Sequence, residues 1–351
     1  MFAALLLASS LLVSASPAPT LTDAGWKAFD AKQYATAYDD FKRAATSGDS
    51  EAMNALGLMF LHGYGRPRDY KQALTWFSAA FAGGNSYGGY NLGRMYLYGW
   101  GTAVDPAKAL DFFKRASDLG NEGAPALIGD MYYNGRGVPK NYDTARTWYE
   151  LGARRGDGYA YASLGFIYER GRGVPKDMAK AVQYDQVAAQ KDDDTGQTQL
   201  AQLYIEGNGV PQDYGKAFQL LSKAVEADNT IAMDALGFLY ENGHGVPQSY
   251  QKAAELYRKS ADLGNAFATV DLGNLYLKGN GVIADYAKAR ALFTSAVGKD
   301  DGRGAYLLGR MAEQGLGQPI DLPGAISWYK QAAAAGYDSA VDALKRLHAS
   351  P

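Results

Sequence analysis

The sequence predicts an all-α protein, an α/α solenoid of stacked helical hairpins, and three regularities support this fold class. A G-x-G pair recurs eight times at a constant spacing of 36 residues, from Gly63/Gly65 to Gly315/Gly317, without any insertion. Six positions after the first glycine of each pair stands a residue that can cap a helix. Small residues recur six positions before that glycine and ten positions after it. A fixed period of this length is typical of repeat architectures.

The N-terminus reads "MFAALLLASSLLVSASPAPT" and is apolar from Phe2 to Val13. That run is shorter than the roughly 20 residues that span a bilayer. Val13 and Ala15 occupy the −3 and −1 positions of a cleavage site, which predicts a signal peptide over 1–15, cleaved after Ala15. A short disordered lead is expected over 16–22. The chain would then be periplasmic or secreted, without a stable membrane anchor. No Lys or Arg precedes Lys27, so a cytoplasmic protein with a misread N-terminus is the alternative.

The ends of the repeat array differ from its middle. Residues 23–48 predict an N-terminal capping hairpin with a short joint and no G-x-G. Eight 36-residue repeats fill 49–336, and residues 337–351 predict a C-terminal capping helix. Stacked repeats need such atypical ends to cover their exposed cores. The repeats are expected to start near 49, 85, 121, 157, 193, 229, 265 and 301.

Each repeat is expected to hold a helix A before the G-x-G pair and a helix B after it. The side-chain oxygens of the capping column accept hydrogen bonds from the first turn of helix B. These residues are Asp69, Asp105, Asn141, Asp177, Asp213, Ser249, Asp285 and Asp321. Helix B should end where Gly, or less readily Asp, adopts the left-handed backbone. Those residues are Gly84, Gly120, Gly156, Asp192, Asp228, Gly264, Asp300 and Gly336.

The centre of helix A carries a column of small residues, which costs about 1 kcal/mol per glycine relative to alanine. The column is Gly57, Gly93, Gly129, Gly165, Ala201, Gly237, Gly273 and Gly309. The cost indicates a close helix crossing, and the alanine column of helix B, from Ala73 to Ala325, is expected to face it. Recurring aromatic residues are expected to form the core. They are Phe60, Tyr96, Tyr132, Tyr168, Tyr204, Tyr240, Tyr276, Trp76, Phe112, Trp148, Tyr184 and Trp328.

Several features that could carry chemistry have simpler structural interpretations. Gly135-Arg136-Gly137 lacks the further glycine of a dinucleotide fingerprint, since Lys140 stands there, so the pair is expected to turn the chain. The histidines 62, 244 and 348 include no i, i+4 pair that would suit zinc. The acids of 191–196 lack the glycine and glutamate of a calcium loop and are read as helix-boundary residues. The sequence therefore predicts no metal, cofactor or catalytic residue.

A net charge of −2 without basic runs predicts no nucleic-acid partner. The chain has no cysteine, so neither disulfides nor a lipid on cysteine are expected.

Three stretches carry a resemblance to a known family. "YNLGRMYLYGWG", "LGFIYERGRGVPKDMAKAVQY" and "LGFLYENGHGVPQSYQKAAELYRKSADLG" resemble Sel1-like repeats, 36-residue relatives of tetratricopeptide repeats, and the likeness extends over residues 24–348. The resemblance implies a right-handed superhelix whose helix A face lines a concave groove for proteins or peptides. A secreted, cysteine-rich branch of the family is linked to β-lactam binding, and the missing cysteines argue against that branch.

By this resemblance we expect an exported, monomeric, non-enzymatic scaffold that binds a protein or peptide, in bacterial envelope signalling, assembly or host interaction. A Gram-negative source is suspected. A binding protein or hydrolase acting on the cell wall or on β-lactams is the alternative. The candidate groove residues vary between repeats, as specific recognition requires and as a plain solvated surface would also show. They are Tyr87, Tyr90, Arg94, Tyr98, Asp130, Tyr133, Asn134, Tyr159, Phe166, Glu169, Arg170, Gln202, Phe238, Asn242, Tyr306 and Arg310.

Overall fold

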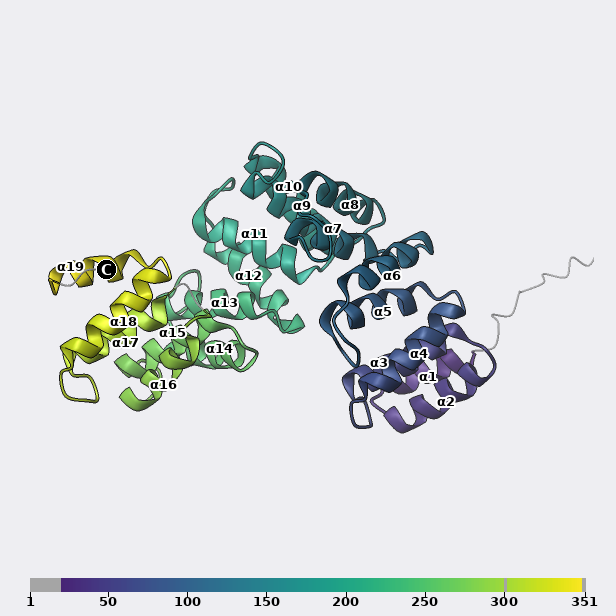
Figure 1. Ribbon diagram of the computed structural model, residues 1–351, viewed down its shortest axis with the longest axis horizontal. Helices are drawn as coiled ribbons and strands as arrows, with labels where there is room; N and C mark the ends of the chain where they lie inside the picture. The colour runs from purple at the N-terminus through teal and green to yellow at the C-terminus, as the bar shows by residue number, and fades with distance from the viewer. Residues whose placement is uncertain (1–19, 300–301, 349–351) are drawn as a thin grey trace, which may run out of the picture. The chain divides into compact units, whose positions relative to one another are not determined.

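The computed structural model describes residues 20–299 and 302–348, and this part of the chain is built from helices α1 to α19 without strands. The expected signal peptide, 1–15, lies outside these residues. The chain divides into two compact units, one reaching to Asn141 and one beginning at Tyr142 (Figure 1). Each unit is a row of antiparallel helical hairpins, which confirms the predicted all-α class.

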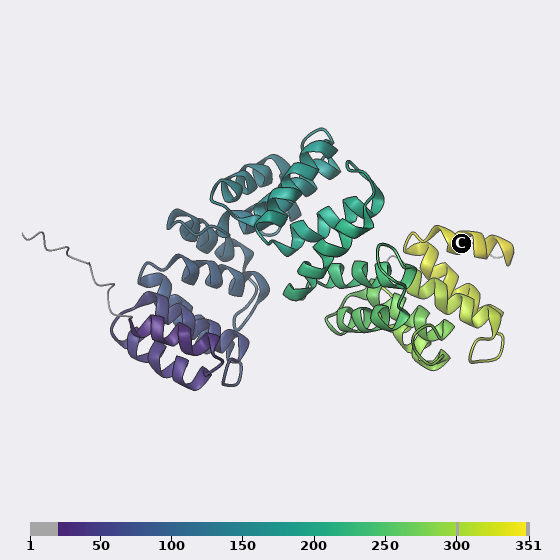
Figure 2. The ribbon, with the colours of Figure 1, turned by 180° about the vertical axis from the view of Figure 1, so that it is seen from behind.

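The first unit holds seven helices, each packed against the next along the chain (Figure 2). Helix α1 begins at Leu21 behind a capping box in which Thr20 and Asp23 satisfy each other's backbone N–H groups. It therefore starts inside the lead that was expected over 16–22. The helices are α1 (Leu21–Asp30), α2 (Tyr34–Thr46), α3 (Ser50–His62), α4 (Tyr70–Ala82), α5 (Ser86–Tyr98), α6 (Pro106–Asp118) and α7 (Ala124–Asn134).

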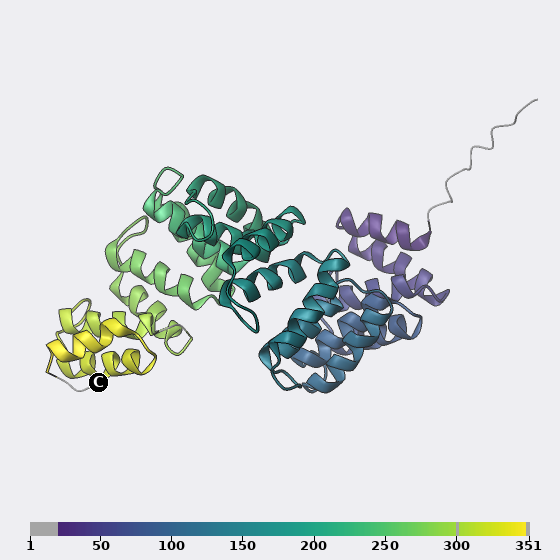
Figure 3. The ribbon, with the colours of Figure 1, turned by 90° about the horizontal axis from the view of Figure 1, so that it is seen from above.

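The second unit continues the pattern through twelve α-helices (Figure 3). They are α8 (Tyr142–Arg154), α9 (Gly158–Arg170), α10 (Met178–Gln190), α11 (Asp194–Glu206), α12 (Tyr214–Ala224), α13 (Thr230–Asn242), α14 (Tyr250–Asp262), α15 (Ala266–Lys278), α16 (Tyr286–Ala296), α17 (Arg303–Gln314), α18 (Leu322–Ala334) and α19 (Asp338–Arg346). A short 3₁₀ turn, η1 (Val225–Ala227), extends α12.

The expected caps begin the B helices. The carboxylate of Asp177, for example, accepts a hydrogen bond from the backbone N–H of Lys180 at 3.0 Å, a contact worth about 1 kcal/mol. Side chains cap in this way at Asp69, Asp105, Asp177, Asp213, Ser249, Asp285 and Asp321, and α8 begins directly after Asn141.

The expected left-handed residues after the B helices also occur, with two acids among the glycines. Asp192 and Asp228 adopt φ values of 57° and 58°. One expectation is wrong, because α16 ends at Ala296 and Gly298 takes the positive φ there. Asp300, the expected terminus of that helix, lies outside the described residues.

The alanine column was expected to face the glycine column, but most of these glycines lie closest to an aromatic ring of helix B, whereas the atoms nearest Gly165 include the carbonyl of Ala181. A Cβ atom on Gly57 would fall 2.4 Å from a ring carbon of Phe77, and one on Gly237 would fall 2.5 Å from Tyr257. The glycines are thus required because a ring of helix B occupies the space that a side chain of helix A would need. The same contact joins Gly93 to Phe113, Gly273 to Phe293 and Gly309 to Tyr329.

The aromatic columns that were expected to form the core are half-buried at the seam between helices A and B. Tyr96 carries the ammonium of Lys108 over its ring at 4.2 Å, and Tyr168 carries that of Lys180 at 5.0 Å. Such rings hold a cation on one side and the core on the other. The fully buried rings stand one position after the Trp76 column, as in Phe77.

Candidate functional site

The two glycines of each G-x-G pair have different structural roles. The first closes helix A: Gly99 has φ 73°, and its N–H donates to the carbonyl of Met95. The second lets the loop approach the preceding helix B, because a Cβ on Gly101 would lie 2.7 Å from Tyr70. The loop therefore turns the chain and joins neighbouring repeats. No feature of this geometry requires a phosphate.

The residue between the two glycines projects from the loop and often stacks on the first residue of the preceding helix B. Tyr64 stacks on Tyr34 with ring centroids 5.5 Å apart, and His244 stacks on Tyr214 at 4.5 Å. This position was not among the predicted site residues, although it holds six different residue types in the eight repeats. Its occupants are Tyr64, Trp100, Arg136, Arg172, Asn208, His244, Asn280 and Leu316.

In the first unit, the candidate residues of α5 join such a loop residue in one continuous contact network. Tyr98 is 45 % exposed and stacks on Trp100 with centroids 5.1 Å apart. The guanidinium of Arg94 lies 5.3 Å from the Trp100 ring and 5.8 Å from that of Tyr90. Arg136 covers the Tyr98 ring at 5.3 Å and donates to the carbonyl of Leu97 at 3.1 Å. Three predicted site residues are thus brought together with two that were not predicted.

The candidates on α7 contribute less open surface. Asn134 is exposed, but its amide donates to the carbonyl of Asp130 at 3.0 Å. Asp130 and Tyr133 are half-buried. This part of the predicted site supplies polar groups that are already engaged within the fold.

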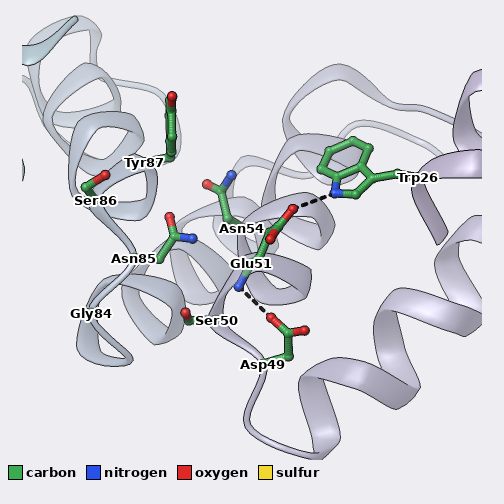
Figure 4. A pocket seen from close by; sticks show the side chains of 9 residues that line it. All are labelled: Trp26, Asp49, Ser50, Glu51, Asn54, Gly84, Asn85, Ser86 and Tyr87. Carbon is green, nitrogen blue, oxygen red and sulfur yellow. Dashed lines mark hydrogen bonds between the residues drawn. The ribbon is translucent and has the colours of Figure 1, made fainter. Parts of the chain in front are cut away.

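A cavity of about 730 Å³ opens beside the starts of α3 and α5, with Tyr87 at its rim (Figure 4). Trp26 lies on the opposite side and donates to the Glu51 carboxylate at 2.9 Å. Asp49 and Asn85 use their side-chain oxygens to cap α3 and α5. Most polar groups of this cavity are therefore already hydrogen-bonded within the fold. Tyr87, which is 56 % exposed, is the main lining side chain left to contact a ligand.

A second cavity, of about 510 Å³, lies over α9, α11 and the start of α13 in the second unit. Phe166, Glu169 and Arg170 form one wall, with the two charged groups paired at 3.3 Å. Gln202 stands on the opposite wall and donates to Glu206 at 2.6 Å. The remaining lining is made of Lys176, neutral amides, hydroxyls and a few apolar side chains, a mixture that can hydrogen-bond a peptide backbone.

The other predicted residues of this unit do not join that cavity. Phe238 is 42 % exposed and contacts His244, while Asn242 donates to the Phe238 carbonyl. Tyr306 packs between Tyr329 and Tyr337, and is a framework residue. The last two candidates also lie outside the lining: Arg310 is exposed and Tyr159 is half-buried.

The family relationship follows from comparison with known proteins. A model described as the Sel1 repeat matches residues 50–85, 88–121, 126–157, 158–193, 195–229, 230–265, 266–301 and 302–337. The chain belongs to the Sel1 repeat family. No curated protein matches it.

Among solved structures, the chain is similar to two Sel1 repeat proteins. One is a protective antigen present in uropathogenic Escherichia coli strains, 31 % identical over 91 % of this chain and 77 % of that one, with a TM-score of 0.50. The other is a Sel1 repeat protein from Oxalobacter formigenes, 32 % identical over 69 % of this chain and 99 % of that one, with a TM-score of 0.59.

Two Sel1 repeats of this chain depart from the ring column, one with Leu221 and one with a carboxyl group. At the position of Phe77 and its equivalents stands Asp185, 1 % exposed, beside Gly165. Burial raises the pKa of this carboxyl to about 8, and the nearby Glu169 and Asp193 add to the rise. With its amide nitrogen turned toward Asp185, Gln199 donates to Oδ1 at 2.9 Å, while Oδ2 has no hydrogen-bond partner. Asp185 therefore remains protonated at neutral pH.

A second group of acids links the A helices of later Sel1 repeats. Burial raises the pKa of Asp234 to about 7, with a further contribution from Asp271. Burial also raises the pKa of Asp271, but its ion pair with Arg303 opposes the rise.

The acids of 191–196 are helix-boundary residues as expected, since Asp193 caps α11 by accepting a hydrogen bond from the N–H of Gly196 at 2.7 Å.

Within 20–299 and 302–348, no three His, Asp or Glu side chains are grouped as a metal site would require. In the same part of the chain, no helix combines the length and apolar character needed to cross a bilayer.

Proposed function

We propose that this Sel1 repeat protein is an exported, monomeric scaffold without enzymatic activity that binds a protein or peptide through side chains of its A helices. The proposal rests on one observation, that recurring residues and variable residues have different roles in this chain. Glycines, caps and rings recur in most repeats and build the framework. Exposed aromatic and arginine side chains differ from repeat to repeat and have no framework role of that kind. Such side chains supply most of the binding energy at protein interfaces.

Export to the periplasm or the medium rests on the N-terminal apolar run, and an envelope adaptor or host-interaction role fits such a location. Mass spectrometry of the mature N-terminus tests the export proposal. A chain starting after Ala15 is expected, and an intact Met1 would contradict export.

The partner can be sought by affinity capture from an envelope fraction. We expect replacement of Tyr90, Arg94 and Tyr98 together by alanine to abolish capture of the specific partner. A matched control replaces three exposed α4 residues, Lys71, Thr75 and Ser78, by alanine. Equal capture by both variants would remove the α5 surface from the proposal.

The alternative, hydrolysis of the cell wall or of β-lactams, is tested with the purified chain. The raised carboxyl pKa values at Asp185 and Asp234 follow first from burial and not from a substrate cleft. We expect no turnover. Turnover that a single Ser, Asp or Glu substitution abolishes would contradict the scaffold proposal.

A further inference from the structure

We propose that the G-x-G edge of the first unit is a docking surface for an acidic, extended peptide segment. This proposal rests on the proposed function and specifies the chemistry of its partner. The surface, which we name the loop-edge patch, comprises Arg68, Tyr70, Arg94, Tyr98, Trp100 and Arg136.

The patch is continuous across three successive loops because each member touches the next. Arg68 lies 5.8 Å from the Tyr70 ring centroid and bonds its hydroxyl at 3.2 Å. Tyr70 stacks on Trp100 at 6.4 Å, and Trp100 stacks on Tyr98 at 5.1 Å. Arg136 then covers Tyr98 at 5.3 Å. Because repeats with a period of 36 residues stack on one another, residues up to 68 positions apart in sequence form one surface.

The arginines of the patch carry positive charge without acidic partners. Arg68, Arg94 and Arg136 form no ion pair with any residue of 20–299 and 302–348. The positive charge of these arginines also affects the pKa of His62, which is lowered. Burial lowers it first, and the Arg94 and Arg68 guanidinium groups lower it further.

Stacking on rings prepares these guanidinium groups for carboxylates. A guanidinium over an aromatic face keeps its N–H donors at its edge, where they can bind a carboxylate bidentately. Arg94 has contacts to the Trp100 and Tyr90 rings, so its side chain is restrained before any partner arrives. Less side-chain entropy is then lost on binding.

An acidic peptide suits the patch better than a nucleic acid does. Nucleic-acid surfaces usually extend a basic stripe across a domain of high pI. The pI of this chain is about 6.0, its net charge is −2, and only three arginines form the patch. Alternating rings and arginines match a segment of spaced carboxylates with apolar groups between them.

Fluorescence anisotropy tests the proposal with the full chain and a fluorescein-labelled peptide of alternating glutamate and glycine. We expect this peptide to bind at least about tenfold more tightly than its glutamine counterpart, with affinity falling as salt rises. The double variant R94Q/R136Q should lose about tenfold or more. R172Q is the matched control, because Arg172 fills the same loop slot in the second unit and lies 5.8 Å from the Tyr142 ring.

A second variant separates charge from folding. Arg136 also bonds the carbonyl of Leu97, so R136Q could loosen its loop. R136K keeps the positive charge but lacks the planar guanidinium group that binds a carboxylate through two N–H donors, so it should bind with intermediate affinity. Thermal unfolding measured by circular dichroism should be the same for all variants.

Several results would overturn the inference. They are equal binding of the glutamate and glutamine peptides, no binding of either, tighter binding of a glutamate-free lysine peptide or of oligothymidylate, and full affinity in R94Q/R136Q. Each of these outcomes leaves the proposed function intact if the envelope capture still depends on Tyr90, Arg94 and Tyr98. Loss of that dependence would overturn the proposed function instead.

Discussion

Asp185 provides a test of how the repeats pack, because it places a carboxyl where the other repeats have a ring or leucine. The perturbation is Asp185→Phe, which restores a ring over Gly165 as Phe113 covers Gly93. Each pKa unit is worth about 1.4 kcal/mol. A rise in the Asp185 pKa from 3.8 to about 8 then corresponds to up to about 6 kcal/mol of lost stability.

The sign of the pH dependence follows from proton binding. The unfolded chain releases the Asp185 proton near pH 4, whereas the folded chain holds it until about pH 8. Between these values the folded state binds more protons, so the contribution of Asp185 to stability falls as the pH rises. It is fully present below about pH 4 and absent above about pH 8.

Urea unfolding of the wild type and Asp185→Phe, followed by circular dichroism at about pH 5 and pH 8.5, measures the effect. We expect the difference in free energy of unfolding between Asp185→Phe and the wild type to grow in favour of the variant by about 4 kcal/mol from the lower to the higher pH. Subtracting the two proteins removes the contribution of Asp234, whose pKa is also raised and which is not among the groups that shift the pKa of Asp185. Asp185→Asn is the control that keeps the shape without the charge, and it should show the same widening. A difference that does not change with pH would refute the reasoning.

Two further predictions concern glycines, and both are measured as the free energy of unfolding in urea. Gly237→Ala should destabilise the protein by about 1–3 kcal/mol, because the new Cβ would meet the Tyr257 ring at 2.5 Å. Gly215→Ala, in α12, should stabilise the protein by up to about 1 kcal/mol, because the new Cβ would meet only the capping carboxylate of Asp213, at 3.3 Å. Equal effects of the two substitutions would contradict the ring contact. Gly245→Ala should cost more than Gly264→Ala, because both have positive φ but only Gly245 would press against a neighbouring helix. Equal costs would show that backbone strain alone requires the loop glycine.

The period and the caps made most of the fold predictable, because both are local properties. Asp177 and its equivalents cap helices wherever the neighbouring repeats lie, and Gly99 ends a helix through its own φ. The partner of the glycine column was not predictable in this way. Two columns of small residues suggested a contact, but the space beside Gly57 is filled by the ring of Phe77. A ring recurs 20 positions after every glycine of the column except Gly165, and this signal in the sequence could have indicated the contact.

The candidate site was only partly predictable, for a related reason. Tyr98 and Arg94 share a helix face and were identified together. Arg136 was interpreted only as part of a turn and Trp100 was not singled out, because the stacking that joins them to Tyr98 depends on the distance between successive loops. Asp185 breaks a column that was not recognised, so its burial could not be anticipated.

The central claim is that framework residues recur while variable surface residues bind the partner. Its most direct test measures, for Arg94→Gln, both the affinity for the partner captured from the envelope and the free energy of unfolding. Arg94 has only surface ring contacts, so its loss should weaken binding by about tenfold and leave stability within about 0.5 kcal/mol of the wild type. Unchanged affinity, or a loss of affinity that accompanies an equal loss of stability, would contradict the claim.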